Sequence, residues 1–327
     1  MFAGRRRRPR RRSVFPSGAA VLAVVVTVVT ASSSFAEGVR PMPVIASFSI
    51  LADLVRQVGG ERARVSALVG PGIDMHAYRP SPSAVRRLAG ARLVVVNGAG
   101  LEGWLDRLVA ASGYRGPVTV ATAGLALRPM GAAPSETGQD HHARASRHDG
   151  RGGFDPHAWQ DPRLVPAMLE NITAGLQSVD PAGGAYYARR AREYGRGVEA
   201  VYRMLRARIF RRKGRPPRVV VPHDGFAYLG AAYGIEMVPL ARFGGEAEVS
   251  AGGLARILRA LRGEEVDALL TENVSSPRLI RQLGAESGVR VGGPLFSDAL
   301  SGPDGPAPNY LALVKHNAAV LIELLRP

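Results

Sequence analysis

Residues 93–97 read Leu93-Val-Val-Val-Asn97, a short apolar run that ends where Gly98 begins a turn. Apolar runs of this length, rich in β-branched side chains, are typical of strands that are buried on both faces of a parallel sheet. Three similar runs lie in the first half of the chain, and helix-like stretches separate them. The other runs are residues 43–48, 65–69 and 118–121, and helices are expected over 50–58, 81–88 and 101–111. This alternation predicts a parallel four-stranded sheet in βα units.

The second half of the chain repeats the pattern. Its apolar runs are residues 218–221, 237–240, 266–271 and 289–291, and its helices are expected over 252–261, 277–286 and 309–325. Between the halves, residues 181–212 carry apolar side chains every three or four positions, which predicts one amphipathic helix roughly 45 Å long. The sequence therefore predicts an α/β protein of two (β/α) lobes, 37–180 and 213–327, joined by a long rigid linking helix at 181–212.

The composition excludes several classes of protein. The chain has 327 residues, which suits two domains, and it contains no cysteine. Disulfide scaffolds, thiolate metal sites and cysteine nucleophiles all require cysteine and are excluded. Phosphate-binding Gly-x-x-x-x-Gly-Lys and the Gly-x-Ser-x-Gly elbow of hydrolases are also absent.

The net charge of +16 first suggests a nucleic-acid or membrane partner, but much of it lies at the N-terminus. Residues 1–36 contain seven arginines, then an apolar run, then small residues including Ser34 and Ala36, which is the order of a secretory signal peptide. Without this segment, 36 basic residues face 27 acidic ones, a net charge of +9. We therefore expect a periplasmic protein with no nucleic-acid partner and no cysteine-linked lipid anchor. Export by the Sec or the twin-arginine route remains open.

Four residues in loops are candidate metal ligands. His76, His223 and Asp298 each follow a predicted strand, and His157 lies in Asp155-Pro-His-Ala-Trp159, immediately before an expected helix. Ligands of open α/β sheets bind at the carboxyl ends of the strands. Three imidazoles and one carboxylate suit tetrahedral Zn(II). A single histidine at such a turn is more often a hydrogen-bonding or capping group, so the residues alone leave both interpretations open.

The sequence motifs around these residues resemble those of a known family. Gly70-Pro-Gly-Ile-Asp-Met-His-Ala-Tyr-Arg-Pro80, Asp155-Pro-His-Ala-Trp-Gln-Asp161, His223-Asp-Gly-Phe-Ala-Tyr-Leu229 and Leu295-Phe-Ser-Asp-Ala-Leu-Ser-Gly-Pro303 are similar to motifs of the zinc/manganese solute-binding proteins of bacterial ABC importers, the cluster A-I (ZnuA/TroA-like) group. The resemblance implies a metal held between the lobes by His76, His157, His223 and Asp298. It also implies delivery to an inner-membrane permease. Manganese-preferring members tend to carry a carboxylate at the third position, so His223 favours the zinc branch.

The segment 130–153 is rich in Gly, Ser and charge, and it contains His141, His142 and His148. It is either a solvated linker or an auxiliary metal loop that collects zinc with low affinity. A periplasmic zinc chaperone is a further possible partner, and a monomer is expected.

The sequence is compatible with three functions. The leading one is capture and delivery of zinc, with manganese or another divalent metal as its variant, and no enzymatic activity. A zinc-dependent hydrolase would keep one position open for water. A zinc-binding adhesin would use the same fold without a transporter. Glu272 and Asn273, at a predicted strand end, either line the cleft or orient a ligand, and His316 is expected to be a surface or capping residue.

Overall fold

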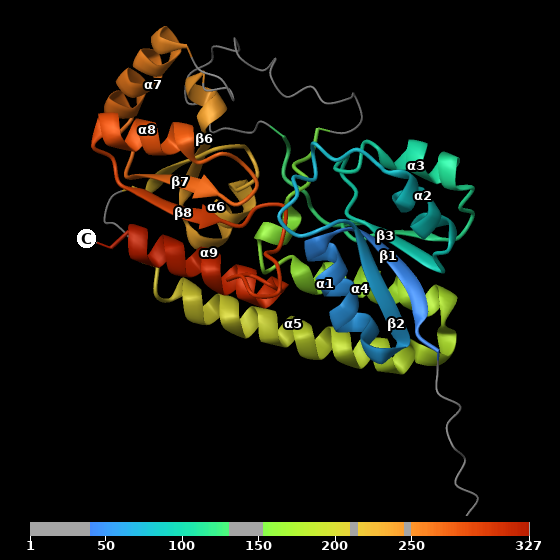
Figure 1. The fold of residues 1–327 in the computed structure, drawn as a ribbon. Coiled ribbons are helices and arrows are strands. Elements are labelled where there is room, and N and C mark those ends of the chain that lie inside the picture. The colour runs from blue at the N-terminus through green and yellow to red at the C-terminus, as the bar shows by residue number, and fades with distance from the viewer. Residues whose placement is uncertain (1–39, 131–152, 210–214, 245–249, 327) are drawn as a thin grey trace, which may run out of the picture. The chain divides into compact units, whose positions relative to one another are not determined.

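The computed structural model describes residues 40–130, 153–209, 215–244 and 250–326 (Figure 1). The predicted signal peptide and the histidines of segment 130–153 lie outside the described residues, as do residues 210–214 at the end of the predicted linking helix. Among the described residues, no helix combines the length and the hydropathy that crossing a membrane requires.

The first lobe is built around a parallel sheet of strand order β2-β1-β3-β4. Its strands are β1 (Met42–Phe48), β2 (Ala63–Val69), β3 (Leu93–Val96) and β4 (Val118–Val120). The run of residues 93–97 supplies β3, and all four residues of this strand are buried, as its near-continuous apolar character predicts. The helices of this lobe are α1 (Ser49–Gly59), α2 (Pro82–Ala89), α3 (Leu105–Ser112) and α4 (Val165–Val179).

The second lobe repeats this arrangement with strand order β6-β5-β7-β8, again with parallel pairing throughout. Its strands are β5 (Arg218–Val221), β6 (Glu236–Pro239), β7 (Ala268–Glu272) and β8 (Val291–Leu295). Its helices are α6 (Ala227–Tyr233), α7 (Ala251–Gly263), α8 (Arg278–Ser287) and α9 (Tyr310–Leu324). Two α/β lobes with parallel four-stranded sheets are therefore confirmed.

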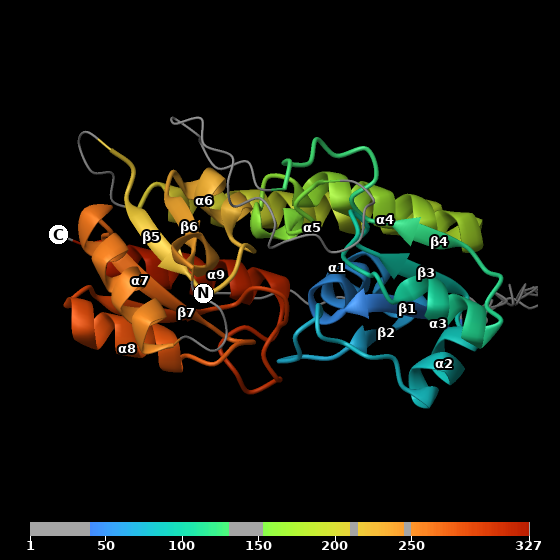
Figure 2. The same ribbon diagram turned by 90° about the horizontal axis from the view of Figure 1, so that it is seen from above.

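Helix α5 (Gly184–Arg206) runs along α4 and α1 in the first lobe and along α9 in the second (Figures 1 and 2). One hydrophobic cluster continues from the first sheet through α5 and α9 to β5 and β7. A smaller cluster lies beneath α7 and α8. Because the lobes share the larger cluster, moving one against the other would expose apolar surface, and this opposes large movements.

Local signals in the sequence set several helix starts. Ser81 and Ser250 accept hydrogen bonds from the backbone N–H groups of Ala84 and Gly253, so both cap their helices. Other boundaries differ from the prediction. Helix α3 begins at Leu105 rather than 101, and β8 runs to Leu295 rather than ending at 291. The linking helix is shorter than 181–212, because Pro181–Gly183 forms a 3₁₀ turn before α5 and the described helix ends at Arg206.

Candidate metal site

The four candidate ligands come from loops of both lobes. His76 lies between β2 and α2, His223 between β5 and α6, and Asp298 between β8 and α9. These three follow the carboxyl ends of parallel strands, as the sequence predicts. His157 precedes a short 3₁₀ turn, Ala158–Gln160, where the sequence suggests a helix.

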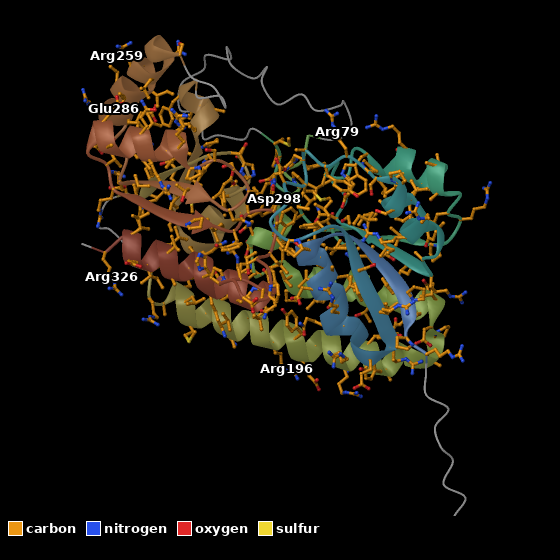
Figure 3. The ribbon with its side chains drawn as sticks, in the orientation of Figure 1. Arg79, Arg196, Arg259, Glu286, Asp298 and Arg326 are labelled. Carbon is orange, nitrogen blue, oxygen red and sulfur yellow. The ribbon has the colours of Figure 1, made fainter. Side chains whose placement is uncertain are left out.

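The fold brings all four side chains together. The Nε2 atom of His76 lies 3.3 Å from Nε2 of His157 and 3.4 Å from Oδ2 of Asp298. The Nε2 atoms of His157 and His223 lie 3.6 and 3.8 Å from the oxygens of Asp298. One ligand atom from each residue lies within 4.8 Å of the others. Asp298 occupies the region between the two sheets (Figure 3). The arrangement surrounds one point with three nitrogens and a carboxylate.

Two of the polar atoms that face this point lack a hydrogen-bond partner in the described part of the chain. Among the described residues, Nε2 of His223 and Oδ1 of Asp298 are buried and form no hydrogen bond. Burying a polar atom without a partner is costly. The side chain of Asp298 is 1% exposed, whereas that of His76 is 42% exposed. A cation at the centre would satisfy the unpartnered atoms, and it would be reached from the side of His76.

His157 is oriented by a neighbour in sequence. Its Nδ1 lies 2.7 Å from Oδ1 of Asp155, and the same oxygen accepts the backbone N–H of His157 at 2.9 Å. A hydrogen bond from Nδ1–H to a carboxylate leaves the lone pair of Nε2 free to bind a metal. Asp155 stands two residues before His157 in the quoted motif, and that spacing is the signal from which its role could have been found.

His223 has an equivalent partner far away in the sequence. Its Nδ1 lies 2.7 Å from Oε2 of Glu272, at the end of β7. Burial disfavours the charged imidazole, but the hydrogen bond to Glu272 and the charges of Asp298 and Glu272 outweigh it and raise the pKa of His223 to about 9. Burial acts to raise the pKa of Glu272, yet its hydrogen bond to His223 prevails and lowers that pKa. For His76, burial is the largest influence and lowers the pKa.

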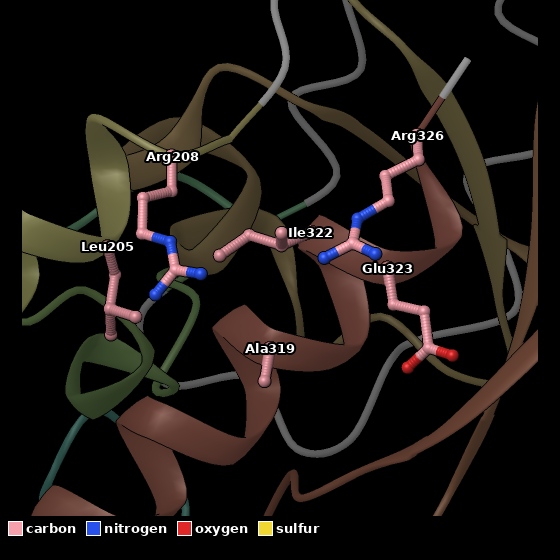
Figure 4. A pocket seen from close by; sticks show the side chains of 6 residues that line it. All are labelled: Leu205, Arg208, Ala319, Ile322, Glu323 and Arg326. Atoms are coloured by element: carbon pink, nitrogen blue, oxygen red, sulfur yellow. The ribbon is translucent and has the colours of Figure 1, made fainter.

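Two other features do not belong to this site. His316 is half-buried at the surface, and its Nε2 lies 2.9 Å from the carbonyl oxygen of Pro294, which agrees with the predicted surface role. A separate pocket lies between the ends of α5 and α9, with Arg208 and Arg326 on either side of Ile322 (Figure 4). Leu205, Ala319 and Glu323 complete it. Two guanidinium groups make this pocket unsuitable for a cation.

Comparison with known proteins identifies the family of the chain. The family model "Zinc-uptake complex component A periplasmic" matches residues 44–324, nearly the whole described chain. The chain belongs to this zinc-uptake component A family. The family consists of the substrate-binding proteins of metal transporters, so this member is the extracytoplasmic metal-binding component of an ABC importer, works with a membrane permease and is not an enzyme.

Individual relatives differ in the metal that their names give. The iron-binding protein YfeA of Yersinia pestis is 27% identical over 291 residues, which cover 89% of this chain and 88% of YfeA. The manganese-binding lipoprotein MntA of Halalkalibacterium halodurans is also 27% identical, over 293 residues that cover 90% of each chain. Membership of the component A family therefore gives a divalent metal as the ligand and does not single out zinc.

A solved structure supports the fold. A metal-free point mutant of the periplasmic metal-binding protein from Candidatus Liberibacter asiaticus superposes with a TM-score of 0.73 at 25% identity. The match covers 87% of this chain and all of that one. The predicted architecture of two lobes is thus shared with a metal-binding protein.

Proposed function

We propose that this protein captures Zn(II) with His76, His157, His223 and Asp298 and delivers it to the permease of an ABC importer. The observation that carries the proposal is the donor set: three imidazole nitrogens and one carboxylate converge on one point. Imidazole donors suit zinc, whereas manganese favours carboxylate, carbonyl and water oxygens.

The spacing of the donors supports tetrahedral coordination. Donors held at about 2.0–2.1 Å from a tetrahedral zinc ion lie roughly 3.3 Å from one another. Four contacts between these side chains measure 3.3, 3.4, 3.6 and 3.8 Å, and all the donor atoms lie within 4.8 Å of one another. Small rotations of the His223 ring would therefore complete the site. Octahedral manganese would require additional oxygen donors.

A closed set of four protein ligands suits capture better than catalysis. A hydrolytic zinc site has three protein ligands and a water molecule in the fourth position. Here the fourth position belongs to Asp298, whose side chain is 1% exposed. Metal held in this way is stored unchanged until docking on the permease drives its release.

Several properties complete the proposal. Residues 37–180 act as the first lobe and residues 213–327 as the second, and the segment 181–212, which contains α5, links them. Residues 1–36 act as a signal peptide. The protein works as a periplasmic monomer without nucleic acid, and a periplasmic zinc chaperone is a further partner. The lack of cysteine favours a form without a cysteine-linked lipid, in contrast to the relative that is named a lipoprotein. The auxiliary loop with His141, His142 and His148 collects zinc with low affinity.

Competition between metals tests the choice of zinc. The purified mature protein, stripped of metal, is titrated with zinc and manganese against a chelating dye, and Co(II) serves as a spectroscopic substitute. We expect one tight zinc site, weaker manganese binding, and an intense tetrahedral Co(II) spectrum. Tighter binding of manganese than of zinc, or a weak octahedral Co(II) spectrum, would refute the proposal.

A further inference from the structure

The end of β7 carries two consecutive polar residues, Glu272 and Asn273. Strand β7 lies between β5 and β8 in the second sheet, and these neighbours lead into the loops of His223 and Asp298. The backbone N–H of Asn273 donates to the carbonyl oxygen of Leu295, the last residue of β8, at 2.9 Å. The pair therefore stands between the two candidate ligands of the second lobe.

Glu272 contacts His223 on the side of the ring that faces away from the metal position. Its Oε2 lies 2.7 Å from Nδ1 of His223, while Nε2 on the other side of the ring faces Asp298. The group of possible metal ligands in the described part of the chain does not contain Glu272. Glu272 thus acts on the ring of His223 rather than on the ion.

The burial of Glu272 argues against a purely structural role for its side chain. Its side chain is 3% exposed, and the preceding residues of β7 are apolar or hydroxylated and buried. A buried carboxylate lowers stability unless it is paired and hydrogen-bonded, and here the charged partner is His223, with a further hydrogen bond from Ser275. An apolar side chain would suit the core better. The carboxylate is therefore best explained by what it does for His223.

Asn273 holds the loop of Asp298 on both sides of the ligand. Its Oδ1 accepts the backbone N–H of Ser297 at 3.1 Å, and its Nδ2 donates to the carbonyl oxygen of Ala299 at 3.0 Å. The residues bound in this way immediately precede and follow Asp298. Because both backbone groups are fixed, the carboxylate of Asp298 has little freedom to turn from the centre of the site.

We infer that Glu272 and Asn273 form a positioning pair that fixes His223 and Asp298 relative to each other, and that Glu272 also strengthens the preference for zinc over manganese. This inference rests on the proposed capture of zinc. A carboxylate behind a ligating imidazole fixes its tautomer and increases its donor strength. Zinc gains more than manganese from a stronger nitrogen donor, because imidazole suits zinc and oxygen ligands suit manganese.

Two variants separate the effect of the hydrogen bond to His223 from the effect of the negative charge of Glu272, and a third variant tests Asn273. In Glu272→Gln the amide oxygen still accepts the Nδ1–H bond but carries no charge, and we expect the pH-independent zinc affinity, measured on the alkaline plateau, to fall about 10-fold with the tetrahedral Co(II) spectrum retained. In Glu272→Ala both the hydrogen bond and the charge are lost, and we expect zinc affinity to fall about 100-fold and the Co(II) spectrum to change. In both, the ratio of zinc to manganese affinity decreases. Asn273→Ala should alter the Co(II) spectrum, because Asp298 is no longer fixed.

Thr271→Val is the matched control. Thr271 precedes Glu272 in β7 and is buried. Its Oγ1 donates to the carbonyl oxygen of Gly292, the second residue of β8, whereas Asp298 follows the other end of that strand. The substitution should lower the melting temperature without changing the metal affinities or the spectrum. If Glu272→Ala keeps the wild-type affinities and ratio, or if Thr271→Val changes them equally, the inference is wrong. A wild-type protein that prefers manganese would instead refute the zinc proposal, and the losses of total affinity would still test positioning.

Discussion

The side-chain amide of Gln160 donates from Nε2 to the carbonyl oxygens of Phe296 and Ser297, at 3.0 and 2.8 Å. Gln160 follows His157 by three positions, and Ser297 immediately precedes Asp298. Trp159 adds a bond from Nε1 to the same Ser297 oxygen at 2.9 Å. The ligand loops of the two lobes are therefore joined directly by buried hydrogen bonds, in addition to the linking helix.

Gln160→Leu should destabilise the metal-free protein. The substitution keeps the volume but removes two buried hydrogen bonds, and we expect the free energy of unfolding to fall by about 1–2 kcal/mol in urea titrations. Zinc affinity should fall as well, because the loop of Asp298 becomes freer. Gln282→Leu is the control, since the Gln282 amide bonds to Glu286 on an exposed helix face, and it should change stability by less than about 0.5 kcal/mol. Equal effects of the two variants would show that the two bonds of Gln160 contribute nothing.

His223→Ala should remove most of the zinc affinity. Structural zinc sites bind with about 10–16 kcal/mol, or roughly 3 kcal/mol per ligand, which corresponds to a loss of about 100-fold or more. His316→Ala is the control, because His316 bonds to the Pro294 carbonyl outside the site. It should bind zinc like the wild type. Competition with a chelating dye measures both variants, and wild-type affinity in His223→Ala would contradict the assigned ligand set.

Zinc affinity should depend on pH well above the ordinary pKa of histidine. The pKa of His223 is raised to about 9, so this imidazole is protonated in the metal-free protein at about pH 7.5 and must lose its proton to bind zinc. Affinity should be flat above about pH 9 and fall about tenfold per unit as the pH decreases below it. The pKa of His76 is lowered, so His76 adds to the decline only in more acidic solution.

Calorimetry in buffers of different ionisation enthalpy counts the protons. About one proton per zinc should be released at about pH 7.5. Glu272→Gln removes a charge that raises the pKa of His223, so the onset of the decline should move to lower pH. An affinity independent of pH between about 9 and 7 would be incompatible with the raised pKa of His223.

Deleting residues 139–149 should leave one tight zinc site. All four candidate ligands lie in the described residues, outside the deleted segment. The deletion removes His141, His142 and His148, so only weaker additional binding should disappear from a zinc titration. Loss of the tight site would mean that the loop supplies a primary ligand.

The sequence predicted the features that depend on neighbouring residues. Buried runs such as residues 93–97 became parallel strands, and a helix formed where 81–88 was expected, because burial and helix formation are determined by side chains a few positions apart. Boundaries were less accurate. A helix was expected directly after His157, but α4 begins only at Val165, because the chain first forms a 3₁₀ turn and then a bend in which Arg163 pairs with Asp161.

The sequence by itself determined the two-lobe α/β plan and, through its motifs, the four candidate ligands. Only the tertiary structure decided that their donor atoms meet at one point and which residues hold them there. Glu272 reaches His223 across 49 positions, and Gln160 reaches Ser297 across 137. Such pairs leave no local pattern, because they are created by the packing of β7 beside β5 and of one lobe against the other.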